Sequence, residues 1–296
     1  MPSEQSSNSS QPRRLPPWLK RPLGGGPEYA RTADAIGQGR LHTICQEARC
    51  PNRGECWSAG TATFLILGDQ CTRRCGFCSV KGGRPSGFVD ENEPARLAEA
   101  VERMGLKHVV ITSVTRDDLE DGGATQFARC IEALRARIPR ITVEILTPDF
   151  RRCRDQAVEI LLPQAPFVWG HNVETVPSLY LSVRAGSRYE DSLELLRRAA
   201  AAPGIVAKSS IMLGLGETRE EVLNVIDDLV SAGVRRMTIG QYLRPSAEQL
   251  DVVEFVTPET FSELGAEARR RGIPWVISTP FARSSYHAEL EHGITQ

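Results

Sequence analysis

The stretch Thr61–Cys78, Thr-Ala-Thr-Phe-Leu-Ile-Leu-Gly-Asp-Gln-Cys-Thr-Arg-Arg-Cys-Gly-Phe-Cys, joins an apolar run to three cysteines. The run predicts a buried strand at 62–68, the first of the fold. Cys71 follows directly on this strand, so its loop is expected at the carboxyl end of a sheet. In α/β barrels, that is the end at which the reacting groups lie.

Beyond this stretch, short β-branched runs alternate with longer amphipathic stretches, which predicts repeated βα units around a parallel sheet. Further strands are expected near 107–113, 140–146, 166–172, 204–213 and 235–242, and helices near 94–105, 124–138, 154–161, 190–202 and 218–232. Thr218 and Glu221 form a capping box at one helix start. The six units predict an α/β fold, a partial (β/α)6 TIM-like barrel, followed by a helix near 258–271, a strand near 273–278 and a C-terminal tail.

The composition limits the classes of function. A hydrophobic share of 41% and a charged share of 25% are typical of a soluble globular enzyme, and no apolar run is long enough to span a membrane. The formal net charge of -1 argues against a basic nucleic-acid surface. We therefore expect neither nucleic acid nor a membrane among the partners.

The first residues lack the apolar core of a secretory signal. We expect a flexible arm whose Trp18 end packs onto the body, and a cytoplasmic location. In that reducing compartment, the eight cysteines indicate metal binding or catalysis rather than disulfides.

Cys71, Cys75 and Cys78 have the spacing C-x3-C-x2-C. Three thiolates on one loop can hold three irons of a 4Fe-4S cluster and leave the fourth iron free to chelate a cofactor. A structural zinc site would need a fourth ligand in a closed site. A redox dithiol would use only Cys75 and Cys78 and would leave Cys71 unexplained.

A second group, Cys45-x4-Cys50-x5-Cys56, stands just upstream. Six soft ligands within 34 residues favour two iron-sulfur clusters. A zinc site remains the alternative for this group, because His42 could complete a Cys3His set.

The first group, with the aromatic Phe77 just before its last cysteine, resembles the signature of the radical S-adenosylmethionine (SAM) enzymes. The resemblance implies that the open iron binds the amino and carboxylate groups of SAM. It also implies that electron transfer cleaves SAM to give a 5′-deoxyadenosyl radical.

The second group, together with Arg283-Ser284-Ser285-Tyr286-His287, resembles the lipoyl synthase family over nearly the whole chain. The resemblance implies an auxiliary 4Fe-4S cluster that donates sulfur, held by Cys45, Cys50, Cys56 and Ser285, with Ser284 as the less favoured neighbour. Oxygen is a harder ligand than thiolate, so the iron held by Ser285 should be the easiest to lose. Its loss would expose sulfides to a carbon radical. An isolated Arg-Ser-Ser would otherwise be a turn or a cap.

What the family resemblance implies is a sulfurtransferase of lipoate biosynthesis that inserts two sulfur atoms into a protein-bound octanoyl-lysine. Its cofactors would be two 4Fe-4S clusters and SAM. The implied partners are octanoylated lipoyl-carrier domains (E2 subunits of 2-oxoacid dehydrogenases and the glycine cleavage H protein), an electron donor such as ferredoxin or flavodoxin, and an iron-sulfur carrier. Two alternatives stay open: another radical SAM enzyme with an auxiliary cluster and a different substrate, or an iron-sulfur carrier or electron-transfer protein.

Four regions are expected along the chain. They are a flexible arm at 1–16, an auxiliary-cluster extension at 17–60, the radical SAM partial barrel at 61–257, and a C-terminal segment at 258–296 that closes the auxiliary site.

Some residues at strand ends could bind SAM. Gly214 and Glu217 resemble the glycine-containing contact region of the family, although Gly214 could equally serve a tight turn. Asn172 and Glu174 offer polar groups for the ribose or the methionine, and Arg184 could pair with a carboxylate. Ordinary surface or capping roles are the alternative for all five.

The segment 112–119 lacks the Gly-Gly-Glu of the wider radical SAM class, which leaves Ser113, Thr115 or a backbone carbonyl for the amine. Cys130 has helical spacing with apolar neighbours and is expected in the core, and Cys153 is expected to be partly exposed. His42 and His287 flank proposed ligands and could orient them.

Overall fold

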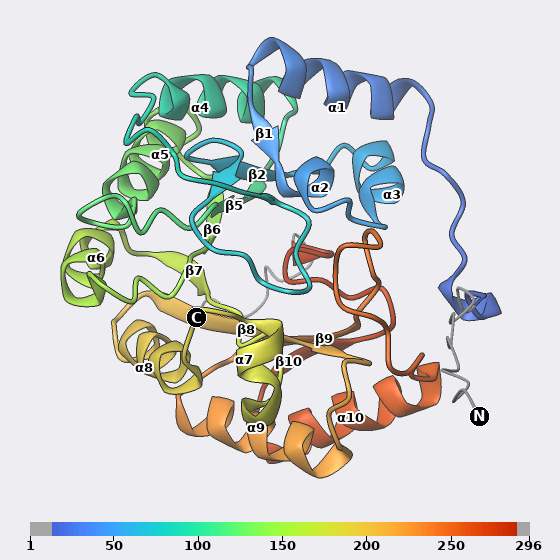
Figure 1. Ribbon diagram of the computed structural model, residues 1–296. Helices are drawn as coiled ribbons and strands as arrows, with labels where there is room; N and C mark the ends of the chain where they lie inside the picture. Colours follow the sequence, from blue (N-terminus) through green and yellow to red (C-terminus); the bar gives the residue numbers. More distant parts are fainter. Residues whose placement is uncertain (1–13, 289–296) are drawn as a thin grey trace, which may run out of the picture.

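The computed structural model describes residues 14–288, and one mostly parallel sheet runs through them (Figure 1). Its strand order is β1-β2-β5-β6-β7-β8-β9-β10, with only β1 antiparallel to its neighbour. The parallel strands are β2 (Thr63–Ile66), β5 (His108–Ser113), β6 (Thr142–Leu146), β7 (Phe167–Gly170), β8 (Ile205–Leu213), β9 (Arg236–Gln241) and β10 (Trp275–Ser278). Each falls within a strand range predicted from the sequence.

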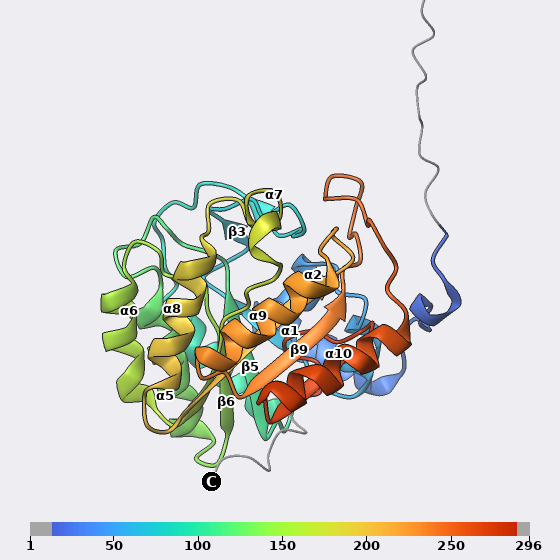
Figure 2. The same ribbon diagram turned by 90° about the horizontal axis from the view of Figure 1, so that it is seen from below.

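Helices alternate with these strands and cover the outside of the curved sheet (Figures 1 and 2). They are α4 (Glu93–Arg103), α5 (Ala124–Arg137), α6 (Arg154–Leu161), α8 (Tyr189–Ala200), α9 (Arg219–Ser231) and α10 (Pro258–Arg271). In the described residues β1 and β10 are the two ends of the sheet and do not pair, so the barrel is open on one side. The predicted α/β partial barrel is confirmed.

Local sequence explains where these elements begin. β2 is buried at every position, as expected for a parallel strand covered on both faces. The predicted capping box at α9 is present: the Thr218 hydroxyl accepts from the Glu221 backbone, and the Glu221 carboxylate accepts from the Thr218 backbone.

The segment ahead of β2 is folded in a way that the sequence pattern did not predict. It contains η1 (Pro17–Leu19), α1 (Pro27–Gln38), β1 (His42–Thr43), α2 (Ile44–Glu47) and α3 (Arg53–Ser58). Leu19, not Trp18, is the residue that packs onto the body: Leu19 is 3% exposed and Trp18 is 39% exposed. The Trp18 end of the arm thus packs onto the body as predicted, and it does so through the last side chain of the 3-10 turn at Pro17–Leu19.

Short elements gather at the carboxyl end of the sheet. Figure 2 shows β3 (Gln70–Cys71) and α7 (Tyr180–Val183) together at the end toward which β9 points. β4 (Lys81–Gly82) pairs with β3, and η3 (Pro177–Leu179) follows β7 in the connection to α7. η2 (Leu162–Gln164), in contrast, lies between α6 and β7 and precedes that strand.

The sheet continues past residue 257, because β10 pairs in parallel with β9. Gln241 then receives the chain after β10, donating from its backbone to Pro280 O. Most of the predicted arm at 1–16, and residues 289–296, lie outside the described residues. Within 14–288, no helix combines the length and apolar character needed to cross a bilayer.

Candidate functional site

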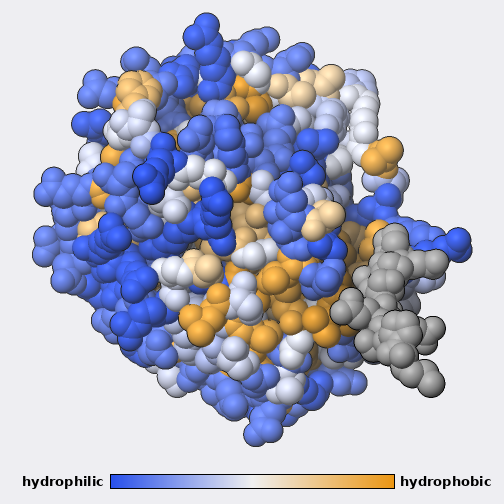
Figure 3. Space-filling model, viewed as in Figure 1, coloured by the Kyte–Doolittle hydropathy of each residue, from blue (hydrophilic) through white to orange (hydrophobic). Residues whose placement is uncertain are grey.

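A cavity of about 340 Å³ lies at the carboxyl end of the parallel strands and reaches into the barrel as far as His108. All six cysteines of the two predicted groups line it: Cys45, Cys50, Cys56, Cys71, Cys75 and Cys78. Figure 3 shows apolar side chains gathered near the centre of the face viewed in Figure 1, within a largely hydrophilic surround. The fold thus brings both cysteine groups to one chamber.

The loop that carries the first group is held against α7. Gly76 N donates to Val183 O at 2.9 Å, and Leu250 N donates to Gly76 O at 2.9 Å. A Cβ placed on Gly76 would lie 2.8 Å from Ser182 O, a backbone atom. Glycine is therefore required for this close approach.

The thiols of this loop are partly shielded from solvent. Burial raises the pKa of Cys75 to about 11 and that of Cys78 to about 12. Cys71 Sγ accepts a hydrogen bond of 3.4 Å from Thr115 N. Thiols with a raised pKa stay protonated until a metal binds, and they then lose their protons and become thiolate ligands.

The second group is carried by two short helices. Cys45 lies in α2, and Thr43 is the N-cap of this helix, with a hydroxyl that accepts from Gln46 N. Cys50 N donates to Cys45 O at 3.1 Å, which folds the two cysteines toward each other, and Cys56 follows in α3. Burial raises the pKa of Cys45 to about 11, and the nearby Cys50 adds to the shift.

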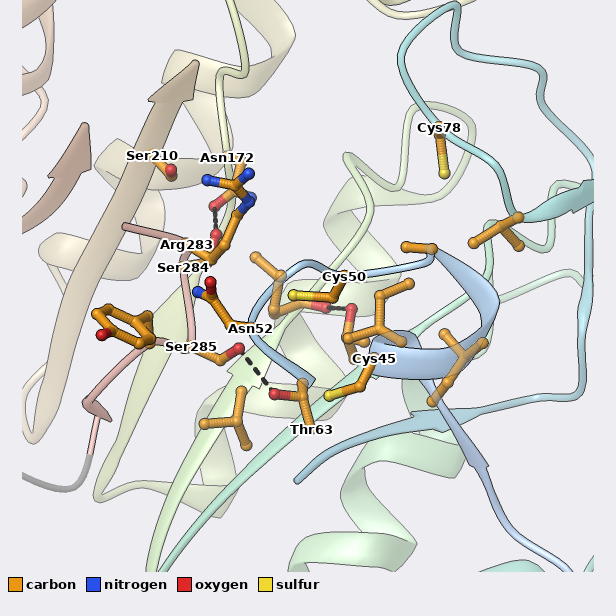
Figure 4. A pocket seen from close by; sticks show the side chains of 18 of the residues that line it. Cys45, Cys50, Asn52, Thr63, Cys78, Asn172, Ser210, Arg283, Ser284 and Ser285 are labelled. Carbon is orange, nitrogen blue, oxygen red and sulfur yellow. Dashed lines mark hydrogen bonds between the residues drawn. The ribbon is translucent and has the colours of Figure 1, made fainter. Parts of the chain in front are cut away.

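The C-terminal segment runs on the side of the cavity where Cys45 and Cys50 lie, and its two serines have different partners (Figure 4). Ser285 Oγ accepts a hydrogen bond of 2.7 Å from Thr63 Oγ1, at the start of β2. Ser284 Oγ donates to Asn172 Oδ1 at 2.9 Å, just beyond β7. In Figure 4 the sulfurs of Cys45 and Cys50 and the hydroxyl of Ser285 border one space.

Further contacts fasten the C-terminal segment to the N-terminal extension. Asn52 Nδ2, between Cys50 and Cys56, donates to Phe281 O at 2.7 Å. Arg21 pairs with Glu55 and donates to the Tyr286 hydroxyl at 3.2 Å. The Tyr286 hydroxyl in turn donates to Glu55 at 2.9 Å.

The chemistry of the cavity wall fits iron-sulfur clusters. Two sets of three soft thiol donors face it, and Asn52 Oδ1 and Ser113 Oγ are buried wall atoms without a hydrogen-bond partner in the described residues. Within residues 14–288, no group of three or more His, Cys, Asp or Glu side chains could hold a metal ion. A cubane differs from a single ion, because each of its ligands binds a separate iron.

Polar residues form another part of the wall. Asn172, Glu174 and Arg184 line the cavity, as does Phe77. Asn172 Nδ2 donates to Glu174 Oε1 at 3.0 Å, and Arg184 Nη1 donates to Asn172 O at 2.8 Å. Burial raises the pKa of Glu174, and the opposite charge of Arg184 only partly offsets it.

Comparisons with known proteins agree with this geometry. Residues 65–229 match the family model of the radical SAM superfamily, and residues 3–50 match that of the N-terminal domain of lipoyl synthase of the radical SAM family. The chain is 52% identical to the lipoyl synthase of Alcanivorax borkumensis over 281 residues, which cover 95% of this chain and 86% of that protein. The chain belongs to the lipoyl synthase family.

Solved structures with low identity share the fold of this lipoyl synthase family member. Methylornithine synthase aligns with a TM-score of 0.54 at 12% identity, over 90% of this chain and 89% of its own. Streptococcus suis SuiB bound to S-adenosylmethionine aligns with a TM-score of 0.57 at 14% identity. That alignment covers 80% of this chain and 57% of the SuiB chain, so this chain spans little more than half the length of SuiB.

Membership of the family establishes the class of reaction. The chain is a radical SAM enzyme that inserts sulfur to form the lipoyl group. Its cofactors are SAM and 4Fe-4S clusters, one of which is auxiliary, and its substrates are lipoyl-carrier proteins. The family and the cofactors predicted from the sequence are therefore confirmed.

Two predicted SAM contacts of the lipoyl synthase lie apart from the cavity wall. The carboxylate of Glu217 accepts from Gly214 N at 2.6 Å and from Leu215 N at 2.9 Å, inside a tight turn. A Cβ on Gly214, whose φ is +97°, would lie 2.3 Å from Glu254 O. These contacts fit the turn that was the alternative role of Gly214, and a SAM contact at either residue stays a prediction.

The sequence did not point to two residues that hold this site together. Thr63 contacts Ser285, but its place in an apolar strand carried no signal of that role. Asn52 donates to Phe281 O. Its position between Cys50 and Cys56 is a sequence signal that could have marked it as a candidate site residue.

The remaining predicted residues have plain surroundings. Cys130 is buried in the core, as predicted, and Cys153 is half-buried. His42 lies 3.5 Å from Glu47, and His287 lies 3.8 Å from Glu55. Thr115 O accepts from the backbone and the hydroxyl of Thr72, so segment 112–119 supports the cysteine loop.

Proposed function

We propose that each cysteine group of this lipoyl synthase holds one 4Fe-4S cluster. Cys71, Cys75 and Cys78 hold the cluster that binds SAM. Cys45, Cys50, Cys56 and Ser285 hold the auxiliary cluster. The observation that carries the proposal is that all of these residues line one cavity, although they come from three separate segments of the chain.

Ser285 is proposed as the auxiliary ligand rather than Ser284. The hydroxyl of Ser285 is directed toward Thr63, beside Cys45, whereas that of Ser284 is engaged by Asn172. An oxygen ligand is poorly matched to iron in an iron-sulfur cluster, so the iron that it holds leaves most readily. This makes Ser285 the point at which the cluster opens.

Asn172, Glu174 and Arg184 are proposed to orient SAM. Arg184 is buried and Glu174 is half-buried, and the two carry opposite charges, as do the carboxylate and ammonium of the methionine moiety. The SAM carboxylate would pair with Arg184 and the ammonium with Glu174, which compensates both side chains for the water they have lost. The pair would therefore favour a ligand with an amino acid end group. Phe77 supplies apolar contact on the same wall.

An apolar part of the cavity is proposed to receive the octanoyl chain and to exclude water. It is lined by Leu65, Val110, Leu146, Met212 and Tyr242. When bound, SAM supplies hydrogen abstraction from unactivated carbon and the auxiliary cluster supplies sulfur, chemistry that no side chain offers. The protein fixes the distances between the reacting groups.

The domain boundaries given above, with the extension at 17–60, the barrel at 61–257 and the closing segment at 258–296, are part of the proposal. So are E2 subunits and the glycine cleavage H protein as carriers, ferredoxin or flavodoxin as electron donor, and an iron-sulfur carrier that rebuilds the consumed cluster. A cytoplasmic location is also proposed, because the free thiols that line the cavity need a reducing compartment to bind metal.

Anaerobic reconstitution followed by assay with SAM, a reductant and an octanoyl-lysyl peptide tests the proposal. About eight irons per chain and a mass gain of two sulfurs are expected. About four irons per chain, or zinc in place of iron, would contradict the proposed auxiliary cluster. Formation of 5′-deoxyadenosine without modification of the peptide would favour another radical SAM substrate, and no cleavage of SAM would favour an iron-sulfur carrier.

A further inference from the structure

The loop between Cys71 and Cys75 contains two consecutive arginines with opposite environments. The side chain of Arg73 is 8% exposed, whereas Arg74 is exposed on the surface. Removing a charged guanidinium from water costs on the order of several kcal/mol of desolvation free energy. Charged hydrogen-bond partners must offset this cost. The partners of Arg73 therefore matter to the loop.

Arg73 uses all three of its nitrogens. Nε and Nη2 donate to the two carboxylate oxygens of Asp117 at 2.9 and 2.8 Å, which is a bidentate pair. Nη1 donates to Asp149 Oδ2 at 2.6 Å and to Ser187 Oγ at 2.9 Å. Asp149 is 0% exposed.

These partners come from three different connections at the carboxyl end of the sheet. Asp117 follows β5, Asp149 follows β6, and Ser187 lies between α7 and α8. Thr72 adds to the same fastening, since its hydroxyl lies 3.1 Å from Asp117 Oδ2. A single side chain thus ties the cysteine loop to the barrel.

The charges of this clamp stabilise one another. Burial by itself would raise the pKa of Asp149, but the hydrogen bond and the charge of Arg73 outweigh burial and hold that pKa well below its usual range. The same balance, with Thr72 contributing, lowers the pKa of Asp117. Both carboxylates therefore stay ionised against the guanidinium.

We propose that Arg73 is a positioning residue for the cluster held by Cys71, Cys75 and Cys78, because its planar fork fixes the loop on Asp117 and Asp149. The inference rests on the proposed role of these three cysteines. The three guanidinium nitrogens of arginine can bind one carboxylate with two nitrogens and a second carboxylate with the third. Lysine carries the same charge on a single nitrogen and cannot make this arrangement. Segment 112–119, without Gly-Gly-Glu, supplies one of the two anchors.

The test compares Arg73→Lys with Arg74→Lys, its exposed neighbour on the same loop. Iron content, the electron paramagnetic resonance signal of the reduced protein with and without SAM, and the reduction potential are measured for both. Arg73→Lys should lower the affinity for the SAM-binding cluster or the rate of SAM cleavage about 10- to 100-fold, as loss of groups that orient metal ligands does. Its signal with SAM should also change.

The auxiliary cluster of the same molecule is the internal reference. It should keep its iron and its signal in Arg73→Lys, and Arg74→Lys should match the unmodified chain in both clusters. Equal loss of both clusters in Arg73→Lys would overturn the inference, because it would indicate a general role in folding. Unchanged signals and rates would overturn it as well.

A second variant, Asp117→Asn, keeps one oxygen acceptor for Arg73, and the side chain at this position is 24% exposed, so the fold tolerates the change better. Removal of a negative charge beside the loop should shift the reduction potential of the SAM-binding cluster upward. No shift would contradict the clamp. If Cys71→Ala kept a SAM-binding cluster, the proposed function itself would fail, independently of Arg73.

Discussion

Thr63 Oγ1 donates a hydrogen bond of 2.7 Å to Ser285 Oγ, although the two residues are 222 positions apart. Thr63 begins the first barrel strand, and Ser285 belongs to the segment that returns after the last one. Their contact closes the side of the cavity on which Cys45 lies, where the auxiliary cluster is proposed. It also places the proposed oxygen ligand under the control of a neighbour that can hold its hydroxyl in one direction.

Replacement of Ser285 separates the two reactions of the enzyme. Ser285→Ala removes the proposed oxygen ligand but no thiol, so cleavage of SAM should persist while lipoyl formation falls at least about tenfold. The assay follows 5′-deoxyadenosine and the mass of an octanoyl-lysyl peptide in the same sample. Unchanged lipoyl formation would count against the ligand role.

Ser284→Ala is the matched control for that experiment. It removes a hydroxyl from the adjacent residue and breaks the hydrogen bond to Asn172, a residue of the proposed SAM site. We expect the iron content of the auxiliary cluster to stay the same. A loss of auxiliary iron in Ser284→Ala, but not in Ser285→Ala, would show that Ser284 and not Ser285 is the ligand.

Thr63→Val tests the contact between Thr63 and Ser285 at nearly constant volume. Loss of one hydrogen bond costs about 0.5–1.5 kcal/mol, so lipoyl formation should fall about two- to tenfold, less than in Ser285→Ala. Thr61→Val is the control, since the Thr61 hydroxyl donates to Cys56 O and does not contact Ser285. Equal effects of the two variants would show that the Ser285 contact has no special weight.

Gly76→Ala should distort the first cysteine loop. The added Cβ would meet backbone at Ser182 O, 2.8 Å away, and overpacking of this kind costs about 1–3 kcal/mol. Gly83→Ala is a suitable comparison, because its Cβ would meet Gln70 Oε1, the end of a flexible side chain. Thermal unfolding and iron content should change in Gly76→Ala alone, and intact iron binding in that variant would refute the prediction.

Cys130→Ala distinguishes a core thiol from a ligand. Cys130 is 0% exposed inside α5, so its truncation should cost about 1 kcal/mol of stability and leave the iron content unchanged. Cys50→Ala, in contrast, should lower the iron content with little effect on the barrel. Iron analysis and denaturant unfolding of both proteins check this, and loss of iron from Cys130→Ala would be the adverse result.

Most of the barrel could be predicted because its strands are short apolar runs separated by amphipathic helices. β5 and β8, for example, lie inside the predicted ranges. The extension at α1 to α3 was not predicted, since its helices are short or polar and are stabilised by contacts with distant segments. Asn52, which bonds to Phe281, is one such case.

The site divides in the same way. Spacing alone predicted Cys71, Cys75 and Cys78 as candidate ligands, because ligands that are neighbours in the sequence leave a local pattern. Thr63 left none, since its partner is remote in sequence. Glu217 has a side chain suited to binding SAM, but its carboxylate accepts hydrogen bonds from the backbone of its own turn. The sequence alone could not predict which of these partners it would have.

The most direct test of the two-cluster account is iron analysis and SAM cleavage by two triple variants, one with Cys45, Cys50 and Cys56 changed to alanine and one with Cys71, Cys75 and Cys78 changed. Each should retain about four irons per chain. The first should cleave SAM without forming lipoyl, and the second should not cleave SAM. Loss of all iron from either variant, or SAM cleavage by the second, would contradict the account.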